Sequence, residues 1–285
     1  NLQRSSFRHH LFHYLSVKWE RSTTRKWVML NNNLSKSAQR LYYFSFHITC
    51  SQRKNFKFKM DKNLLIGLSP NSKLIKEYKK SLTSLTTLQW EASIGLMLGD
   101  ASLQTQNKGK TYRMKFEWSD KSKPYLLHVY NLFYEWVLSN PHKKSRLSPK
   151  GNLVVNWGFQ TISHEAFNPL AKLFLNNSKK GILDSLIMDY LTERGLAYWF
   201  MDDGGKLDYN KNSKNRSIVL NTQSFTDQEV EKMSKELMAK FNFECELRTN
   251  KSKKVIVISN NSYPLFYELV SPHIIPEMKY KLPQL

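Results

Sequence analysis

Two apolar segments of the chain each end on a carboxylate. The segment Leu88–Gly99 runs into Asp100, and a second one, Leu196–Met201, leads to Asp203. A helix carries partial negative charge at its C-terminus, so an Asp at that end costs about 0.3–1 kcal/mol. Two acids at equivalent and unfavourable positions therefore indicate a function, the alternative being that both are ordinary residues beside a turn.

The chemistry open to this pair of acids is metal binding. If the two segments pack side by side, Asp100 and Asp203 meet at one end and repel each other unless a cation neutralises them. Hard oxygen ligands with open coordination positions suit Mg²⁺. We therefore expect Asp100 and Asp203 to bind Mg²⁺ and to be catalytic.

Lysines follow the two acids at nearly equal distances along the chain. Lys180 comes 80 residues after Asp100, and Lys281 comes 78 residues after Asp203. A lysine near a bound metal ion can polarise the attacking water or stabilise the charge that develops on phosphorus. The matched spacing favours catalytic roles for Lys180 and Lys281, although a single lysine in so basic a chain is more simply a solvated charge.

The helix expected at Leu88–Gly99 carries three small residues on one face, Ala92, Gly95 and Gly99. Glycine costs about 1 kcal/mol in a helix interior, so two of them in one turn need a reason. Close packing against a second helix is such a reason, and it would bring both acids to one end.

Other expected elements repeat in the same order. The first half is expected to have a strand at Tyr112–Trp118, a helix at Tyr125–Leu138, a strand at Leu153–Thr161 and a helix at Ala166–Leu175. The second half is expected to have a strand at Ser217–Thr222, a helix at Thr226–Phe241, strands at Cys245–Thr249 and Val255–Ser259, and a helix at Tyr263–Val270. A basic helix is expected at Lys73–Leu82, and the core is expected to contain Trp118, Trp136, Trp157 and Trp199. The repeat predicts a pseudo-two-fold molecule with both sheets on one side.

The chain is strongly basic. Its 285 residues include 44 Lys and Arg against 23 Asp and Glu, a net charge of +21. This excess favours a polyanionic partner, which can be DNA, RNA or an anionic membrane surface. A membrane-spanning protein is excluded, because no apolar run reaches the roughly 18–20 residues that a span needs. Cys50 and Cys245 form neither a disulfide framework nor a zinc cluster, which indicates a reducing compartment or independence from disulfides.

Residues 1–59 are expected to be a separate basic extension. Residues 1–60 contain 12 Lys and Arg but a single acid, Glu20, and they lack a hydrophobic period. Three interpretations stay open. The segment is an appended or upstream-translated stretch without a fold, a mitochondrial transit peptide, which is typically rich in Arg and Ser and poor in acids, or a nucleic-acid-binding arm.

Both acid-bearing segments resemble the repeated motif of a known family. Residues 93–101 read SIGLMLGDA, and residues 196–204 read LAYWFMDDG. They are similar to the two motifs of single-chain LAGLIDADG homing endonucleases, and within that family the chain resembles the monomeric omega-intron meganucleases of yeast mitochondria. The resemblance runs from about Leu68 to Leu285. Departures at Ser93, Ile94, Ala101 and Tyr198 leave the acids in place but make the two motif helices different from each other.

The resemblance implies an α+β fold of two pseudo-symmetric αββαββα units, in residues 60–190 and 191–285. Their motif helices pack centrally, and their saddle-shaped antiparallel sheets lie in the DNA major groove. The resemblance places the metal-binding acids on Asp100 and Asp203 and the active-site lysines on Lys180 and Lys281. The implied reaction is Mg²⁺-dependent hydrolysis of both strands of double-stranded DNA at a long asymmetric site. The implied protein is a mitochondrial monomer that promotes intron mobility.

Residues that contact DNA bases are expected on strands and loops that this fold turns toward the major groove. The candidates are His142, Lys144, Asn210, Gln223, Arg113, Lys115 and Lys251. Two other functions are compatible with the same scaffold: an RNA maturase that assists splicing, with intron RNA as its partner, and a non-catalytic DNA-binding protein. The presence of both acids and both lysines favours cleavage.

The basic extension yields a prediction about truncation. Deletion of residues 1–59 should leave the thermal unfolding transition and DNA cleavage intact, because the repeat begins after this segment. Differential scanning calorimetry and a cleavage assay on the truncated and full-length chains would check this. Loss of the thermal transition on truncation would show that the segment packs on the core.

Overall fold

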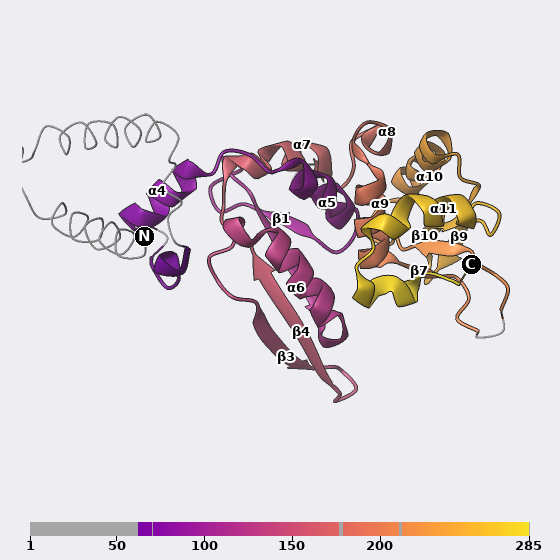
Figure 1. Ribbon diagram of the computed structural model, residues 1–285, viewed down its shortest axis with the longest axis horizontal. Coiled ribbons are helices and arrows are strands. Elements are labelled where there is room, and N and C mark those ends of the chain that lie inside the picture. The colour runs from indigo at the N-terminus through magenta and orange to yellow at the C-terminus, as the bar shows by residue number, and fades with distance from the viewer. Residues whose placement is uncertain (1–61, 70, 177–178, 211–212, 285) are drawn as a thin grey trace, which may run out of the picture. The chain divides into compact units, whose positions relative to one another are not determined.

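The computed structural model describes residues 62–69, 71–176, 179–210 and 213–284 (Figure 1). The extension expected at residues 1–59 lies outside these ranges, and its interpretation stays a prediction. Within the described ranges, every helix is too short or too polar to cross a membrane.

Two helices form the centre of the fold. Helix α5 (Thr87–Leu98) begins after Thr86, whose hydroxyl accepts the backbone N–H of Gln89 while the Gln89 side chain accepts that of Thr86. Helix α9 (Glu193–Asp203) begins after Thr192, whose side chain likewise caps the first turn. Caps of this kind contribute about 1 kcal/mol each. Most residues of α5 and α9 are buried, and the two helices pack against each other.

The two central helices approach each other through their backbones at Gly95 and Gly195. A Cβ atom at Gly95 would lie 2.0 Å from the carbonyl oxygen of Gly195 and 2.9 Å from the amide nitrogen of Trp199. Both are backbone atoms, so no side-chain rotation could make room. The expected close helix packing is confirmed, and it brings the C-terminal ends of α5 and α9 side by side.

The first half contributes a four-stranded antiparallel sheet. Its strands are β1 (Ser102–Gln104), β2 (Arg113–Ser119), β3 (His142–Leu147) and β4 (Leu153–Gln160), in the spatial order β1-β2-β4-β3. Side chains alternate between the two faces of the sheet. On β2, Met114, Phe116 and Trp118 are buried, and the residues between them point to the other face.

The second half repeats this arrangement. Its strands are β7 (Gly204–Lys206), β8 (Ile218–Leu220), β9 (Cys245–Asn250) and β10 (Lys253–Ile258), in the order β7-β8-β10-β9. Each position in this order matches one in the first sheet. The expected α+β fold with two repeated antiparallel sheets is confirmed, whereas the division into residues 60–190 and 191–285 stays a prediction.

The strands β1, β3 and β7 were missed by the sequence-based expectation. Each residue of β3 is exposed, and β1 and β7 are three residues long. Such strands show no hydrophobic alternation. They form because β2, β4 and β8 offer unpaired backbone edges to which they bind.

Helices cover the inner faces of the sheets. Helix α6 (Lys123–Leu132) packs on β2 and β4, and α10 (Asp227–Phe241) packs on β9 and β10. Helix α7 (Asn168–Phe174) contacts α5, and α11 (Tyr263–Val270) contacts α9. The described residues also form helix α4 (Lys73–Ser81), helix α8 (Leu186–Tyr190) and the short hairpin of β5 (Leu175–Asn176) and β6 (Lys179–Lys180).

Two expected helices were too long. Helix α6 ends at Leu132 rather than Leu138, because the chain turns into a 3₁₀ segment that lets the Trp136 indole N–H reach Gln89 on α5 at 3.2 Å. Helix α7 begins at Asn168 rather than Ala166, after another 3₁₀ turn. Tertiary contacts therefore decide where both helices begin and end.

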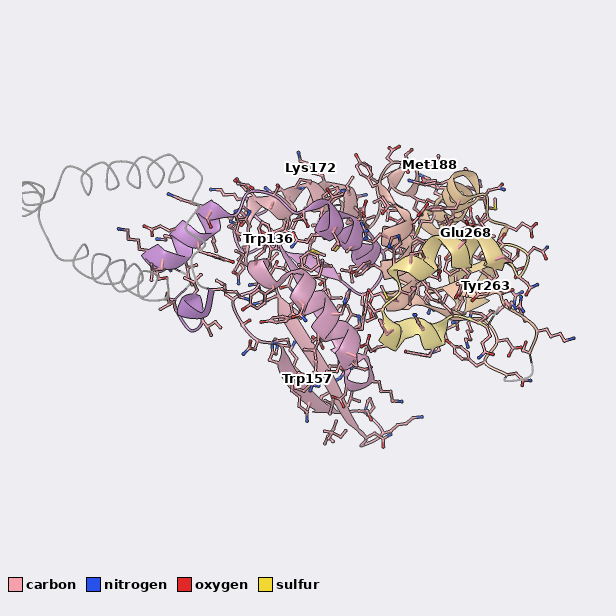
Figure 2. The ribbon with its side chains drawn as sticks, viewed as in Figure 1. Trp136, Trp157, Lys172, Met188, Tyr263 and Glu268 are labelled. Atoms are coloured by element: carbon pink, nitrogen blue, oxygen red, sulfur yellow. The ribbon has the colours of Figure 1, made fainter. Side chains whose placement is uncertain are left out.

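Three of the four tryptophans expected in the core are buried: Trp118, Trp136 and Trp199. Trp157, labelled in Figure 2, is only partly buried, and the expectation for it was wrong in this respect. Its indole N–H donates to Asp120 at 2.6 Å, and the Lys123 ammonium lies 4.0 Å from its ring centroid. Trp157 therefore contacts polar as well as apolar neighbours, because this part of β4 lies at the edge of the main core.

The helix contact yields a prediction about stability. Gly95→Ala should lower the free energy of unfolding by about 2–3 kcal/mol, since overpacking against fixed backbone forces the helices apart. This corresponds to a fall in Tm of roughly 5–10 °C in a chain of this size. Leu88→Ala, at an exposed position of the same helix, is the matched control and should shift Tm by a degree or two. Equal Tm values for the two variants would contradict the contact.

Candidate active site

The two acids lie at adjoining helix ends. Asp203 is the last residue of α9, and Asp100 follows Gly99, the C-cap of α5. The pKa of Asp203 is raised to about 7, first by burial and then by the nearby charge of Asp100. Burial among protein atoms also raises the pKa of Asp100, although its side chain remains open to solvent at the mouth of the site. The structure thus brings together the two acids that the sequence analysis singled out.

Lys180 and Lys281 lie beside these acids in equivalent ways. The Lys180 ammonium, on β6, donates to the carbonyl oxygens of Gly99 and of Ala101, the latter at 3.3 Å. The Lys281 ammonium, at the end of a 3₁₀ helix, donates to the carbonyl oxygens of Met201 at 2.5 Å and Asp202 at 3.2 Å. Each lysine therefore binds the negative end of one central helix, where a cation is favoured.

The electrostatics of the four groups are mutually dependent. Burial lowers the pKa of Lys180 and Lys281, and the charges of Asp203, Asp100 and the neighbouring Asp202 oppose this effect. Both lysines in turn hold the pKa of Asp203 below the value that burial alone would produce. The site therefore holds carboxyl groups and two ammonium groups together in a region where charge is poorly solvated.

The donor atoms fit an open site for a hard divalent cation. Asp100 and Asp203 offer carboxylate oxygens, and positive charge would relieve the repulsion between them. Among the described residues, no group of three or more His, Cys, Asp or Glu side chains is arranged to enclose a metal ion. Water and substrate oxygens would have to complete the coordination, which is the usual situation for Mg²⁺.

Sequence reasoning missed a third acid of the site, Asp202. Its carboxylate accepts the backbone N–H of Asp100 at 2.7 Å and the indole N–H of Trp118 at 2.5 Å. Burial is the main cause that raises the pKa of Asp202 well above its ordinary value. The only signal in the sequence was the doubled acid at the end of the second motif.

Four candidate DNA-contacting residues gather on the outer face of the first sheet. The strand register places His142 opposite Gly158, which also pairs with Glu117, so His142 and Glu117 share a face. Alternation along the strands puts Arg113, Lys115 and Lys144 on that same face. The Lys144 ammonium lies 2.8 Å from the Glu117 carboxylate, and the Lys115 ammonium lies 3.7 Å from it.

The three candidates of the second half are more widely spread. Asn210 follows β7, Gln223 follows β8, where its amide donates to Asn221 at 3.3 Å, and Lys251 lies in the exposed turn between β9 and β10. Sequence reasoning missed polar residues on the strands themselves. These are Gln104, Glu117 and Asn156 on the first sheet and the ion pair of Glu246 with Arg248 on the second. These residues could be assigned to one face of each sheet only after the strand register was known.

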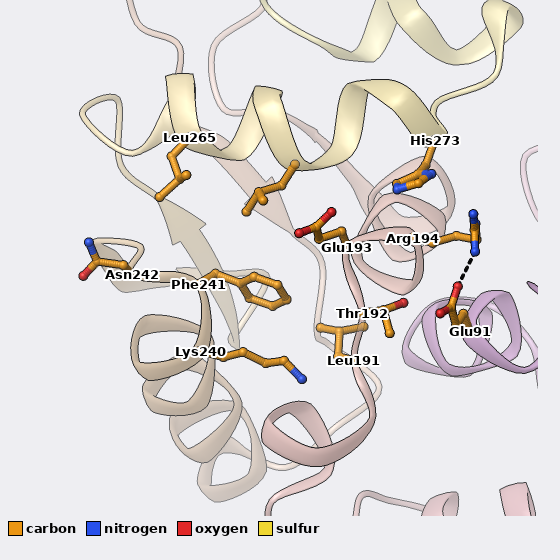
Figure 3. Close-up of a pocket in the computed structure, with 11 residues that line it drawn as sticks. Glu91, Leu191, Thr192, Glu193, Arg194, Lys240, Phe241, Asn242, Leu265 and His273 are labelled. Carbon is orange, nitrogen blue, oxygen red and sulfur yellow. Dashed lines mark hydrogen bonds and ion pairs between the residues drawn. The ribbon is translucent and has the colours of Figure 1, made fainter. Parts of the chain in front are cut away.

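A cavity of about 720 Å³ lies away from the acids (Figure 3). It is lined by residues from the beginning of α9, the end of α10 and one side of α11, whereas Asp203 is at the other end of α9. At its edge Arg194 forms an ion pair with Glu91 of α5, drawn as a dashed line in Figure 3. The cavity is therefore separate from the candidate active site.

Fold and site together define a class of protein: a chain with two repeated halves, whose paired acids lie at the adjoining ends of two packed helices. The pattern of the LAGLIDADG DNA endonuclease family matches residues 90–266. The chain belongs to this family.

Individual relatives agree with this assignment. The chain is 49% identical over 223 residues to probable intron-encoded endonuclease 1 of Wickerhamomyces canadensis, covering 78% of this chain and 96% of that protein. The solved structure titled "The homing endonuclease I-WcaI bound to its DNA recognition sequence" is similar with a TM-score of 0.76 and 48% identity, over 79% of this chain and 99% of that one. The cytochrome b mRNA maturase bI2 of Debaryomyces hansenii is 30% identical over 67% of this chain and 72% of that protein.

The raised pKa of Asp203 yields a prediction about pH and stability. The folded state holds its proton up to about pH 7, whereas the unfolded state releases it near pH 4. The metal-free protein therefore loses stability from this group as pH rises from about 4 to 7. Asp203→Asn should raise Tm at pH 8 by a few degrees and by much less at pH 5.

Thermal scans in EDTA at the two pH values would measure this difference. Asp189→Asn, at an exposed acid on α8, is the control and should leave Tm unchanged at both pH values. An equal shift in Tm for Asp203→Asn at pH 5 and pH 8 would contradict the raised pKa of Asp203.

Proposed function

We propose that this chain is an intron-encoded homing endonuclease, which hydrolyses both strands of double-stranded DNA at a long asymmetric site and thereby promotes intron mobility. The observation that carries the proposal is the pair of acids at adjoining helix ends, Asp100 and Asp203, each with a half-buried lysine bound to the backbone beside it. Two matching sets of groups in one chain suit a substrate with two strands. One relative named as a probable intron-encoded endonuclease and one solved homing endonuclease bound to DNA support the same activity.

LAGLIDADG nucleases generally depend on divalent metal ions, and for this chain we propose Mg²⁺, held by Asp100 and Asp203. A bound cation of this kind polarises a phosphate oxygen and makes a bound water a stronger nucleophile. The acids bind the cation only in their charged form. Because the pKa of Asp203 lies at about 7, metal binding should weaken below neutral pH.

The chain's own groups orient the reacting phosphates. Asp100 and Asp203 would orient the attacking waters through their free carboxylate oxygens. Lys180 and Lys281 would each place a positive charge where negative charge develops on phosphorus. Their ammonium groups are fixed by backbone carbonyls, so this charge is in place before the substrate arrives.

The outer faces of the sheets are the proposed DNA-binding surface. Arg113, Lys115, His142 and Lys144 point from one face of the first sheet, and a two-stranded ribbon fits the width of the major groove. Arg and Lys donate to phosphates and to the guanine edge, whereas Asn and Gln pair with adenine. We propose that Asn210, Gln223 and Lys251 make the corresponding contacts from the second half.

We propose that the protein acts as a monomer in the mitochondrion. Both sets of acids and lysines lie in one chain, so no second copy is needed to cut two strands. The relatives include an intron-encoded endonuclease and a cytochrome b mRNA maturase of yeasts, which supports a mitochondrial origin.

A second candidate function is RNA maturation, with intron RNA as the partner. The maturase relatives of Debaryomyces hansenii and Saccharomyces cerevisiae favour it. Cleavage explains better why both acids and both lysines are present. Binding to RNA alone does not require two carboxylates that repel each other.

The proposed function is tested by cleavage of a plasmid that carries an intronless large-rRNA gene fragment, with the I-WcaI recognition sequence in a second plasmid. We expect a linear product in Mg²⁺ and none in EDTA. Asp203→Asn should abolish the product and retain DNA binding in a gel-shift assay, because phosphate contacts remain when metal binding is lost. Undiminished cleavage by this variant at saturating Mg²⁺ would remove Asp203 from the mechanism. Tight binding by the wild type without any product would favour the non-catalytic alternative.

The two lysines yield a prediction about strand preference. Lys180→Met and Lys281→Met should slow cleavage of different strands, because each lysine is bound to the backbone carbonyls next to the acid of one half. We expect a decrease of about 10²–10⁴-fold, the range of a positioned proton-transfer group. Single-turnover cleavage of end-labelled duplex would identify the slower strand. If both variants slow both strands equally and only through weaker binding, the lysines are phosphate contacts, which would reduce the salt slope by about one.

A further inference from the structure

Asp202 makes contacts that link the two halves at the centre of the site. Its Oδ2 atom accepts the backbone N–H of Asp100 at 2.7 Å, and its Oδ1 atom accepts the indole N–H of Trp118 at 2.5 Å. Both donors belong to the first half, whereas Asp202 is on α9 of the second half. Since both oxygens already accept N–H groups, Asp202 is poorly placed to be a further metal ligand.

The two acids of the site differ in how their backbones are held. Asp203 is part of α9 itself. Asp100 lies beyond α5, where the N–H of Gly99 binds the Gly95 carbonyl and the N–H of Ala101 binds the Leu96 carbonyl. The N–H of Asp100 between them donates to the Asp202 carboxylate instead of to a carbonyl of α5.

Among the described residues of the first half, this contact has no counterpart. The residue equivalent to Asp202 in the first motif is Gly99, which has no side chain. A Cβ atom at Gly99 would lie 2.2 Å from Oδ2 of Asp202. The glycine therefore leaves the space that the carboxylate occupies, and the pair Gly99 and Asp202 makes the centre of the site asymmetric.

We propose that Asp202 is a positioning residue, which fixes the backbone of Asp100 and thereby sets the rate at which one of the two DNA strands is cut. The proposal rests on the proposed endonuclease function. It assigns Asp202 to the half-reaction of Asp100 and Lys180, although Asp202 is adjacent in sequence to Asp203. A merely structural role would affect both strands alike.

The test uses Asp202→Asn in the full-length protein. One carboxylate oxygen becomes an NH₂ group, so one of the two N–H contacts must be lost. We expect single-turnover cleavage of the strand that Lys180→Met slows to fall at least about 10-fold, which corresponds to 1.4 kcal/mol. The other strand should change less than about 3-fold, and the Kd for DNA less than about 2-fold. Asp189→Asn, which removes an exposed charge on α8, should change neither strand.

A rescue experiment separates positioning from general damage. Adding Trp118→Phe to Asp202→Asn removes the competing indole donor, so the remaining amide oxygen is free for the Asp100 N–H. The double variant should regain cleavage of the slow strand to within about 3-fold of the wild type. Amide hydrogen exchange of the metal-free proteins gives a readout independent of cleavage. The Asp100 amide should exchange faster in Asp202→Asn and return toward the wild-type rate in the double variant.

Each outcome decides between specific conclusions. Equal slowing of both strands, or unchanged exchange of the Asp100 amide in Asp202→Asn, would overturn the inference. Absence of cleavage by the wild-type protein would contradict the proposed function, while the exchange rates would still judge the Asp202 contact. If Asp202→Asn does not fold, Gly99→Ala presses on the same carboxylate from the opposite side. It should slow the same strand, and equal slowing of both strands by this variant would also overturn the inference.

Discussion

The backbone contact between Gly95 and Gly195 sets the spacing on which the rest of the structure depends. Because neither residue has a side chain, α5 and α9 approach until the carbonyl oxygen of Gly195 occupies the space that a Cβ at Gly95 would need. The helices run in the same direction through this contact. Their C-terminal ends, and with them Asp100 and Asp203, therefore lie together, and the two sheets that follow the helices extend from this common point.

This packing has an electrostatic cost that defines the site. Two carboxylates share a region where burial raises their pKa, and two lysines approach them while binding the last carbonyls of the central helices. The large apolar core around α5 and α9 offsets the repulsion between the carboxylates, because most residues of both helices are fully buried. A site of this kind favours the binding of cations and phosphates. A cation neutralises the carboxylates, and a phosphate neutralises the ammonium groups.

The two halves have the same strand order but different details. The first sheet presents several basic side chains around Glu117, whereas the second presents the ion pair of Glu246 with Arg248 on its outer strand. At the centre, Gly99 and Asp202 are a non-equivalent pair. A DNA site read by such a molecule need not be a palindrome, because the contacts offered by the two halves differ. The two halves therefore differ both on their outer strands and beside the acids.

The sequence by itself determined the central helices, the positions of both acids and the repeat, because these features are carried by local periodicity, small residues and matched spacing. It also indicated the lysines, at Lys180 and Lys281, through their distance from the acids. Only the tertiary structure decided the strands β1, β3 and β7, which lack an apolar pattern and exist by pairing with neighbours. It likewise decided the role of Asp202, whose partners are more than eighty residues away in the chain. Contacts between distant segments leave no local pattern, so they become visible only when the helices and sheets are packed together.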